Sequence, residues 1–237
     1  MRILIVNDDG LYAEGIKILV NWAKQFADVT VCAPKTEQSA KSHSLEIRNS
    51  FEITKVDLFD GVESYMVDST PADCVRWGIV GLHRTYDLVL SGINKGFNLG
   101  NDTLYSGTLA AASEAVANGH KAVALSTYYY SFEGVEKGLD TVKEYFEQNK
   151  LLDLCPLYNV NIPFDKKGIK ITRKGLFYYH DVFIADGENM YKQYTDFKYE
   201  LTDDLGIDYN AVMSDFISIS PFNIDKTDYE TLNKLIK

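Results

Sequence analysis

The first 33 residues carry the pattern of a β-α-β unit, and this unit limits the possible folds more than any other feature. Residues 3–6 are an unbroken apolar run rich in β-branched side chains, which is typical of a strand buried on both faces of a parallel sheet. Apolar residues at helical spacing follow within residues 14–26, and residues 29–33 form a second apolar run. A helical crossover between two strands of one sheet makes them parallel. The pattern therefore favours an α/β fold.

Alternating strand and helix patterns continue along the chain. Further strands are expected at residues 65–67, 87–90, 122–126, 158–163, 169–172 and 211–220. Helices are expected from residue 71, from residue 106, over residues 133–148 and from about residue 227. The first of these has a clear start signal, with Thr70 as N-cap, Pro71 at the first helical position and Asp73 in the first turn. The length fits a single domain, residues 1–237, with or without an elaboration.

Composition excludes several classes of function. The net charge of −10 argues against broad nucleic-acid binding, which needs basic patches. No apolar run approaches the roughly 20 residues of a membrane helix, and the N-terminal run is too short for a signal peptide. Cys32, Cys74 and Cys155 are far apart and odd in number, which fits neither a disulfide framework nor a zinc site. We expect reduced thiols, a cytoplasmic protein, and no nucleic-acid or membrane partner.

Two adjacent carboxylates follow the first predicted strand, in the run Asn7-Asp8-Asp9-Gly10. Ligands of open α/β sheets bind just beyond the carboxyl ends of the strands. Two neighbouring anions repel each other unless a positive group lies between them, and a divalent metal is one such group. Asn, Asp and Gly also form surface turns. On this stretch alone, the metal site and the turn are equally good interpretations.

Polar loops follow three predicted parallel strands, at residues 7–13, 34–44 and 91–106, and the fold would bring them to one edge of the sheet. Together they offer only oxygen ligands, from Asp8, Asp9, Ser39 and Asn94. Such a set suits a hard cation, Mg²⁺ or Mn²⁺. Taken singly, Ser39 also fits a loop hydroxyl and Asn94 a left-handed turn residue.

A glycine-rich loop leads into a predicted helix at Ser106-Gly107-Thr108. Free N–H groups and the helix dipole favour a phosphate at such a helix start, although the glycines also fit tight turns. A cation beside a phosphate site indicates phosphoryl hydrolysis, in which the metal polarises the phosphoryl oxygen and activates a water.

The last third of the chain has a different character. Aromatic and polar residues alternate over residues 176–200, and Asp186-Gly187 gives a turn signal between two arms of a hairpin. An isolated hairpin is marginal in water, so this one should pack on something, either its own domain or a partner subunit. The final helix should turn Leu232 and Ile236 inward.

Several blocks of sequence, taken together and in this order, resemble the SurE family (stationary-phase survival protein, 5'-nucleotidase). The blocks are Asn7-Asp8-Asp9-Gly10, Ala33-Pro34 with the loop Ser39 to Ser44, Ser69 to Val75, Ser91-Gly92-Ile93-Asn94, Asn98-Leu99-Gly100, Asp102, Tyr105-Ser106-Gly107-Thr108 and Asn159-Val160-Asn161-Ile162-Pro163. The resemblance covers residues 1–163 in detail, and the last third only in general character.

The resemblance implies a Rossmann-like, doubly wound, mostly parallel α/β sheet with a C-terminal β-hairpin and helix extension. Residues 1–163 would be the catalytic core and about 176–237 an extension used in oligomerisation. It also implies a divalent-metal-dependent 5'-nucleotidase with one Mg²⁺ or Mn²⁺ per subunit, which can also act on 3'-nucleotides and short polyphosphate. For the oligomeric state, the resemblance implies a homodimer or a homotetramer in which the subunits exchange their C-terminal segments.

The functional residues that the resemblance implies agree with the loop argument where the two overlap. The metal ligands would be Asp8, Asp9, Ser39 and Asn94, and the phosphate contacts Asn98, Ser106, Gly107 and Thr108. The convergence of the loops adds the hypothesis that Asp8 or Asp9 is the catalytic proton acceptor, with the role of nucleophile as the alternative. The chain departs from the usual family residues at Ser69, Phe97, Ala111 and Ala115. Phe97 lies in the site loop, where it can narrow the pocket or stack on a base.

Other classes of protein share part of this pattern. A receiver-like signalling domain also binds Mg²⁺ through an acidic pair, but it needs a phospho-accepting aspartate where this chain has Ser91 to Asn94. A nucleoside hydrolase needs more carboxylates around its calcium. A non-catalytic nucleotide-binding module stays open. Metal-dependent phosphate release from a nucleotide separates these alternatives.

Overall fold

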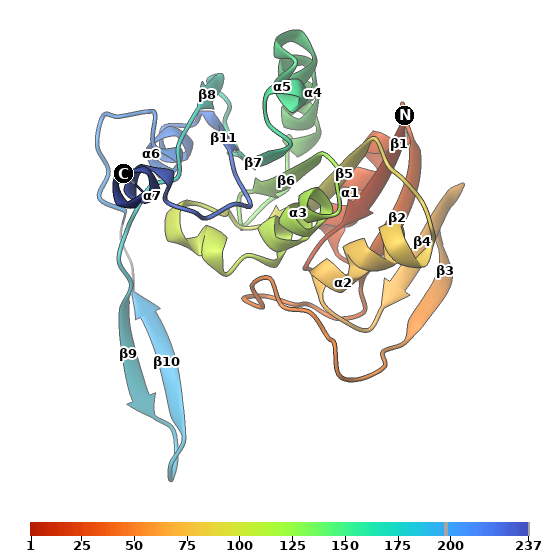
Figure 1. Ribbon diagram of the computed structural model, residues 1–237, viewed down its shortest axis with the longest axis horizontal. Helices are drawn as coiled ribbons and strands as arrows, with labels where there is room; N and C mark the ends of the chain where they lie inside the picture. Colours follow the sequence, from red (N-terminus) through yellow and green to blue (C-terminus); the bar gives the residue numbers. More distant parts are fainter. Residues whose placement is uncertain (197–198, 237) are drawn as a thin grey trace.

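A mixed nine-stranded sheet runs through the computed structural model, which describes residues 1–196 and 199–236 (Figure 1). The strand order is β3-β4-β2-β1-β5-β6-β7-β11-β8. The strands are β1 (Arg2–Val6), β2 (Asp28–Pro34), β3 (Ile53–Phe59), β4 (Val62–Val67), β5 (Leu88–Lys95), β6 (Ala122–Thr127), β7 (Leu157–Ile162), β8 (Ile169–Ile171) and β11 (Ile217–Pro221). From β4 to β7 all neighbours pair in parallel, which confirms the predicted doubly wound α/β fold.

Helices cover both faces of this sheet. The helices of the described residues are α1 (Glu14–Ala23), α2 (Pro71–Arg76), the π-helical η1 (Trp77–Gly81), the 3₁₀ helix η2 (Gly100–Leu104), α3 (Gly107–Ala117), α4 (Val135–Asn149), α5 (Leu151–Leu154), α6 (Asp208–Met213) and α7 (Tyr229–Leu235). The apolar faces of α1 and α4 share one core cluster, and α2 and α3 pack in the cluster on the opposite face. As predicted, Thr70 caps α2: its Oγ1 accepts the Asp73 N–H at 3.2 Å.

The chain reverses its direction of travel across the sheet between β1 and β5. From β1 it moves outward through β2 to β4, and from β5 it moves the opposite way through β6 to β7. In open α/β sheets, ligands bind at the carboxyl ends of the strands beside such a switch point. The loops after β1 and β5 carry Asp8, Asp9 and Asn98, so the topology places the predicted site there.

One expected strand, residues 211–220, is wrong in its first part. Residues 208–213 form helix α6, and the strand β11 begins at Ile217. Tyr209, Ala211 and Val212 are buried at spacings that suit a short helix, and Asp215 in the left-handed region (φ 66°) ends it. The side chain of Asp208 is fully buried and accepts the N–H groups of Gly100 at 2.8 Å and Gly175 at 2.9 Å. Helix α6 thereby ties the C-terminal part of the chain to the loop after β5.

The predicted hairpin forms from β9 (His180–Ala185) and β10 (Tyr191–Asp196), and it projects away from the sheet (Figure 1). Its turn contains Asp186, whose N–H donates to Met190 O at 2.8 Å, and Gly187 with φ 126°. Every residue of β9 is exposed, so this strand does not pack on its own domain.

The final helix also differs from the expectation. Asp228 caps α7 and accepts the Thr231 N–H at 3.0 Å, but Leu232 and Ile236 are exposed instead of buried. Among the described residues, every helix is too short or too polar to cross a bilayer. Cys32 and Cys74 are buried free thiols and Cys155 is a half-buried one, as predicted.

Candidate active site

A cleft of about 410 Å³ lies at the carboxyl ends of β1, β2 and β5. It brings together most of the predicted site residues, which are Asp8, Asp9, Ser39, Asn94, Asn98 and Ser106. Glu37, Asp102 and Lys95 also line it. Residues that are up to 98 positions apart in the chain therefore share one surface, as the loop argument predicted.

Asp8 lies at the floor of the cleft and is only 6% exposed. Thr108 Oγ1 donates to Asp8 Oδ1 at 2.6 Å, so this predicted phosphate contact also fixes the carboxylate. A Cβ atom on Gly107 would lie 2.7 Å from Asp8 Cβ, closer than real side chains approach. Glycine at position 107 therefore lets the start of α3 rest directly against Asp8. Burial raises the pKa of Asp8, and the hydrogen bonds from Thr108 oppose this rise.

Asp9 is half-buried beside Asp8. Its Oδ2 accepts the Lys95 backbone N–H at 3.3 Å, which links the ends of β1 and β5. Burial raises the pKa of Asp9 to about 7, and the negative charge of Asp8 adds to this effect. The site thus forces two carboxylates together, and a positive group between them would relieve both penalties.

Asn94 is a strand residue and not a left-handed turn residue. It pairs with Ser126 of β6, after a register irregularity between Ser91 and Asn94, so β5 extends five residues past the predicted end. Its Nδ2 donates to Gly96 O at 2.7 Å, which leaves the Oδ1 atom to face a ligand. The sequence pattern predicted a loop at Asn94 and Lys95, but both residues pair with β6 and belong to the strand.

Ser39 lies in the exposed loop after β2, and its Oγ donates to Glu37 Oε1 at 2.6 Å. Two flanking residues, Ala40 (φ 57°) and Ser42 (φ 53°), adopt the left-handed conformation that favours glycine. The N–H of Gln38 donates to Asp8 O at 2.8 Å, and this bond brings the loop against the end of β1. Sequence reasoning overlooked Glu37, although it stands two residues before a predicted ligand.

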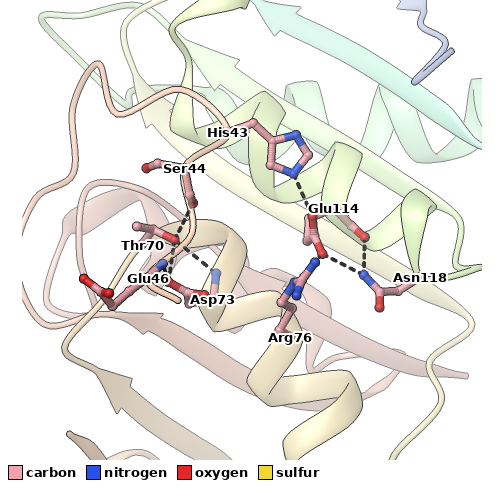
Figure 2. A network of polar contacts seen from close by, with 8 residues as sticks. All are labelled: His43, Ser44, Glu46, Thr70, Asp73, Arg76, Glu114 and Asn118. Atoms are coloured by element: carbon pink, nitrogen blue, oxygen red, sulfur yellow. Dashed lines mark hydrogen bonds and ion pairs between the residues drawn. The ribbon is translucent and has the colours of Figure 1, made fainter. Parts of the chain in front are cut away.

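A polar network fastens the far side of this loop to α2 and α3 (Figure 2). Figure 2 shows His43 and Arg76 reaching Glu114 from two different segments. His43 Nε2 and Arg76 Nε each lie 2.7 Å from a separate oxygen of the buried Glu114 carboxylate. Hydrogen bonds from His43, Arg76 and Asn118 lower the pKa of Glu114 to about 2, and the bond from His43 has the largest effect. No histidine was assigned a role from the sequence, because 71 residues separate His43 from Glu114.

Thr70 and Asp73 hold the next part of the same loop. Thr70 Oγ1 donates to Ser44 O at 2.8 Å, and Asp73 Oδ2 accepts the Glu46 N–H at 3.0 Å (Figure 2). The cap of α2 therefore also positions the loop that carries Ser39.

Asn98 is buried and held by asparagines of β7. Its N–H donates to Asn161 Oδ1 at 2.8 Å, its Nδ2 donates to Ser126 Oγ at 2.9 Å, and its carbonyl accepts from Asn159 Nδ2 at 2.8 Å. The asparagines in the run 159–163 thus support the loop after β5, a role that the sequence pattern did not reveal.

The residues of the cleft fit a hard cation. The described residues contain no group of three or more His, Cys, Asp or Glu side chains placed to hold a metal. Asp8 and Asp9 instead share the cleft with the neutral oxygens of Ser39 and Asn94, and both carboxyl pKa values are raised. Two repelling carboxylates with neutral oxygen donors suit Mg²⁺ or Mn²⁺ better than Zn²⁺, which prefers nitrogen and sulfur.

Comparison with known proteins agrees with this picture. The sequence model of the family described as survival protein SurE matches residues 3–181. A protein named 5'-nucleotidase SurE from Thermosipho melanesiensis is 36% identical over 246 residues, which cover 99% of this chain and 96% of that protein. A protein of the same name from a Thermoanaerobacter species is 38% identical over 245 residues, with 99% and 97% covered.

The fold has a close match as well. The crystal structure of the SurE protein from Aquifex aeolicus superimposes with a TM-score of 0.82 at 32% sequence identity, and the match covers 99% of this chain and 98% of that one. From the match of the family model and from relatives that are similar over their full length, the chain belongs to the survival protein SurE family.

Proposed function

We propose that this protein is a 5'-nucleotidase, a phosphohydrolase that releases phosphate from nucleoside monophosphates. The observation that carries the proposal is the juxtaposition of the Asp8–Asp9 pair with the N-terminus of α3 in one cleft, with Thr108 bonded to Asp8. The name 5'-nucleotidase SurE of relatives that align over the whole chain supports it.

The proposal includes dependence on one divalent cation per subunit, Mg²⁺ or Mn²⁺. Asp8, Asp9, Ser39 and Asn94 are the residues that would hold it. When bound, such a cation polarises a phosphoryl oxygen and lowers the pKa of water. Ser39 Oγ donates to Glu37 in the present arrangement, so its lone pairs stay available to a ligand.

The chain's own contribution is to bind and orient the phosphate. Ser106 caps α3: its Oγ accepts the Leu109 N–H at 3.1 Å, which leaves its hydroxyl proton to donate to a phosphate oxygen. The positive end of the α3 dipole favours the same anion. Asn98, Gly107 and Thr108 complete the proposed set, and Asp8 or Asp9 would accept the proton of the attacking water. Asp9 is the more accessible of the two.

The test is phosphate release from adenosine 5'-monophosphate with Mg²⁺, with Mn²⁺ and with a chelator. We expect turnover only with metal, and a loss of at least about 100-fold in the variant Asp9→Asn. Asp60→Asn, an exposed carboxylate in the turn between β3 and β4, is the matched control. Near-normal metal-dependent activity of Asp9→Asn would contradict the assignment, and nucleotide binding without turnover would favour a non-catalytic module.

Further expectations from the family resemblance are proposals that the same assay can address. Adenosine 3'-monophosphate and tripolyphosphate in the substrate panel test for 3'-nucleotidase and polyphosphatase activity. We also propose a homodimer or homotetramer with exchanged C-terminal segments, because every residue of β9 and residues 191–195 of β10 are exposed. The free thiols support a cytoplasmic location.

A further inference from the structure

We propose that Phe97 and Tyr129 form an aromatic wall on which the base of the nucleotide stacks. This inference rests on the proposed nucleotidase function and specifies which part of the substrate the outer cleft recognises. Both side chains line the same cleft as Asp8 and Ser106. They come from different segments, Phe97 from the loop after β5 and Tyr129 from the segment after β6.

The wall and the phosphate end occupy different depths of the cleft. Asp8 is 6% exposed and Ser106 is 9% exposed, whereas Tyr129 is 57% exposed. A nucleotide whose phosphate lies against the start of α3 must extend its sugar and base toward the open side. Its base then lies on the open side of the cleft, which Tyr129 lines.

Each ring of the aromatic wall has an aromatic or cationic neighbour. Lys95 Nζ lies 5.2 Å from the centroid of the Tyr129 ring, and the Tyr130 ring meets Tyr129 edge-on at 5.2 Å. The Phe97 and Tyr128 rings lie 6.1 Å apart, which links the two segments. Such contacts restrict the rotamers of the rings, which reduces the conformational entropy lost when a base stacks on them.

The remaining charges of the cleft explain why stacking should dominate. Asp8, Asp9, Glu37 and Asp102 outnumber Lys95 among the charged side chains that line the cleft, so its net charge is negative without a cation, and the base gains little from charge. Stacking on a ring face needs no matched donors or acceptors, and it is stronger for a larger base. We therefore expect purine nucleotides to be preferred over pyrimidine nucleotides.

The first test compares the variants Tyr129→Ala and Phe97→Ala on two substrates, adenosine 5'-monophosphate and ribose 5-phosphate, which lacks a base. The ratio of kcat/KM for the nucleotide to kcat/KM for the sugar phosphate should fall by about 5- to 150-fold, mainly through KM of the nucleotide. Tyr129→Phe should keep the ratio, because the ring face remains. An equal loss on both substrates would overturn the inference.

Tyr12→Ala is the matched control. Tyr12 is 56% exposed, as Tyr129 is, and lies in the loop after β1, but it does not line the cleft. In Tyr12→Ala, the ratio of kcat/KM for the nucleotide to kcat/KM for the sugar phosphate should equal that of the wild type.

The second test does not require catalysis. Calorimetric titration of adenosine into the wild type and into Tyr129→Ala should show weaker binding to the variant by a similar factor. If the wild type releases no phosphate from either substrate, the proposed nucleotidase function is wrong. The titration still tests whether a base stacks on the aromatic wall. Equal adenosine affinity in both proteins would overturn the inference of base stacking even if the protein is a nucleotidase.

Discussion

Asp9 occupies a position that is unfavourable for an ionised carboxylate. Burial and the neighbouring Asp8 raise its pKa from 3.8 to about 7. As the pH rises from about 4 to about 7, the unfolded chain has already lost a proton that folded Asp9 still holds, so the free energy of unfolding falls. The penalty is complete above pH 7, where the folded carboxyl also ionises.

Replacement of Asp9 by Asn should therefore stabilise the protein in the presence of a chelator while it abolishes activity. At pH 8 the free energy of unfolding should rise by roughly 2–4 kcal/mol, and the gain should shrink toward pH 4. Urea denaturation of both proteins across this pH range is the measurement, with Asp60→Asn as the control. A less stable Asp9→Asn protein at pH 8 would contradict the conclusion that ionised Asp9 destabilises the folded protein.

Gly107 should tolerate no side chain. The added Cβ of Gly107→Ala would meet Asp8 Cβ at 2.7 Å and Asp8 Oδ2 at 2.8 Å, so either Asp8 or the start of α3 must move. We expect activity to fall by about 100-fold or more, since small misplacements at a reacting centre have effects of this size. Ser113→Ala in the same helix is the control. Wild-type turnover by Gly107→Ala would show that the close contact is unimportant.

At the scale of elements, the loop after β2 depends on contacts to two helices. Glu114 of α3 is 4% exposed and joins His43 of the loop to Arg76 of α2 (Figure 2). Because its pKa is lowered from 4.5 to about 2, the stabilisation is fully present above pH 4.5 and is lost as the pH falls toward 2.

The variant Glu114→Gln should be less stable than the wild type by about 1–3 kcal/mol at pH 7. The difference should diminish between pH 4.5 and pH 2, where the wild-type carboxylate takes up its proton. Chemical denaturation at several pH values measures this, and Glu136→Gln on the exposed side of α4 serves as the control. A difference that does not depend on pH would rule out the ion-pair explanation.

Most elements could be predicted from the sequence because local patterns determine them. Apolar runs marked the central strands, the N-cap at Thr70 marked the start of α2, and the small residues after Thr108 marked α3. The extension of β5 to Lys95 was missed because Gly92 and Asn94 are loop formers, and only pairing with the distant β6 keeps them in the strand. Helix α6 was missed because Ser214 and Asp215, where the helix ends, were included in one strand with the apolar residues on both sides of them.

The site shows the same division. The positions of Asp8, Asp9, Ser39 and Asn94 at one edge follow from parallel topology, which the sequence predicts. The bonds from Thr108 to Asp8 and from His43 to Glu114 join residues 100 and 71 positions apart, and no local pattern encodes them.

At the scale of the whole molecule, the hairpin β9–β10 extends into solvent with Val182, Phe183 and Ile184 all more than half exposed. Proteins rarely leave such an apolar ribbon uncovered in water, where isolated hairpins are marginal. Deletion of residues 180–196, with a short Gly-Ser link, should reduce the proposed homodimer or homotetramer to single chains. Light scattering after size-exclusion chromatography measures the mass. An unchanged assembly mass would refute the proposed exchange of C-terminal segments.

The buried carboxylate of Asp208 has a consequence for the order in which the protein matures on the ribosome. Domains begin to fold while synthesis proceeds from the N-terminus at about 5–20 residues per second. Asp8 and Asp9 are made first, but Gly100 and Gly175 cannot find their acceptor until Asp208 has left the exit tunnel. A nascent chain arrested before residue 208 would therefore carry all proposed metal ligands and phosphate contacts, yet its loop after β5 would lack this anchor.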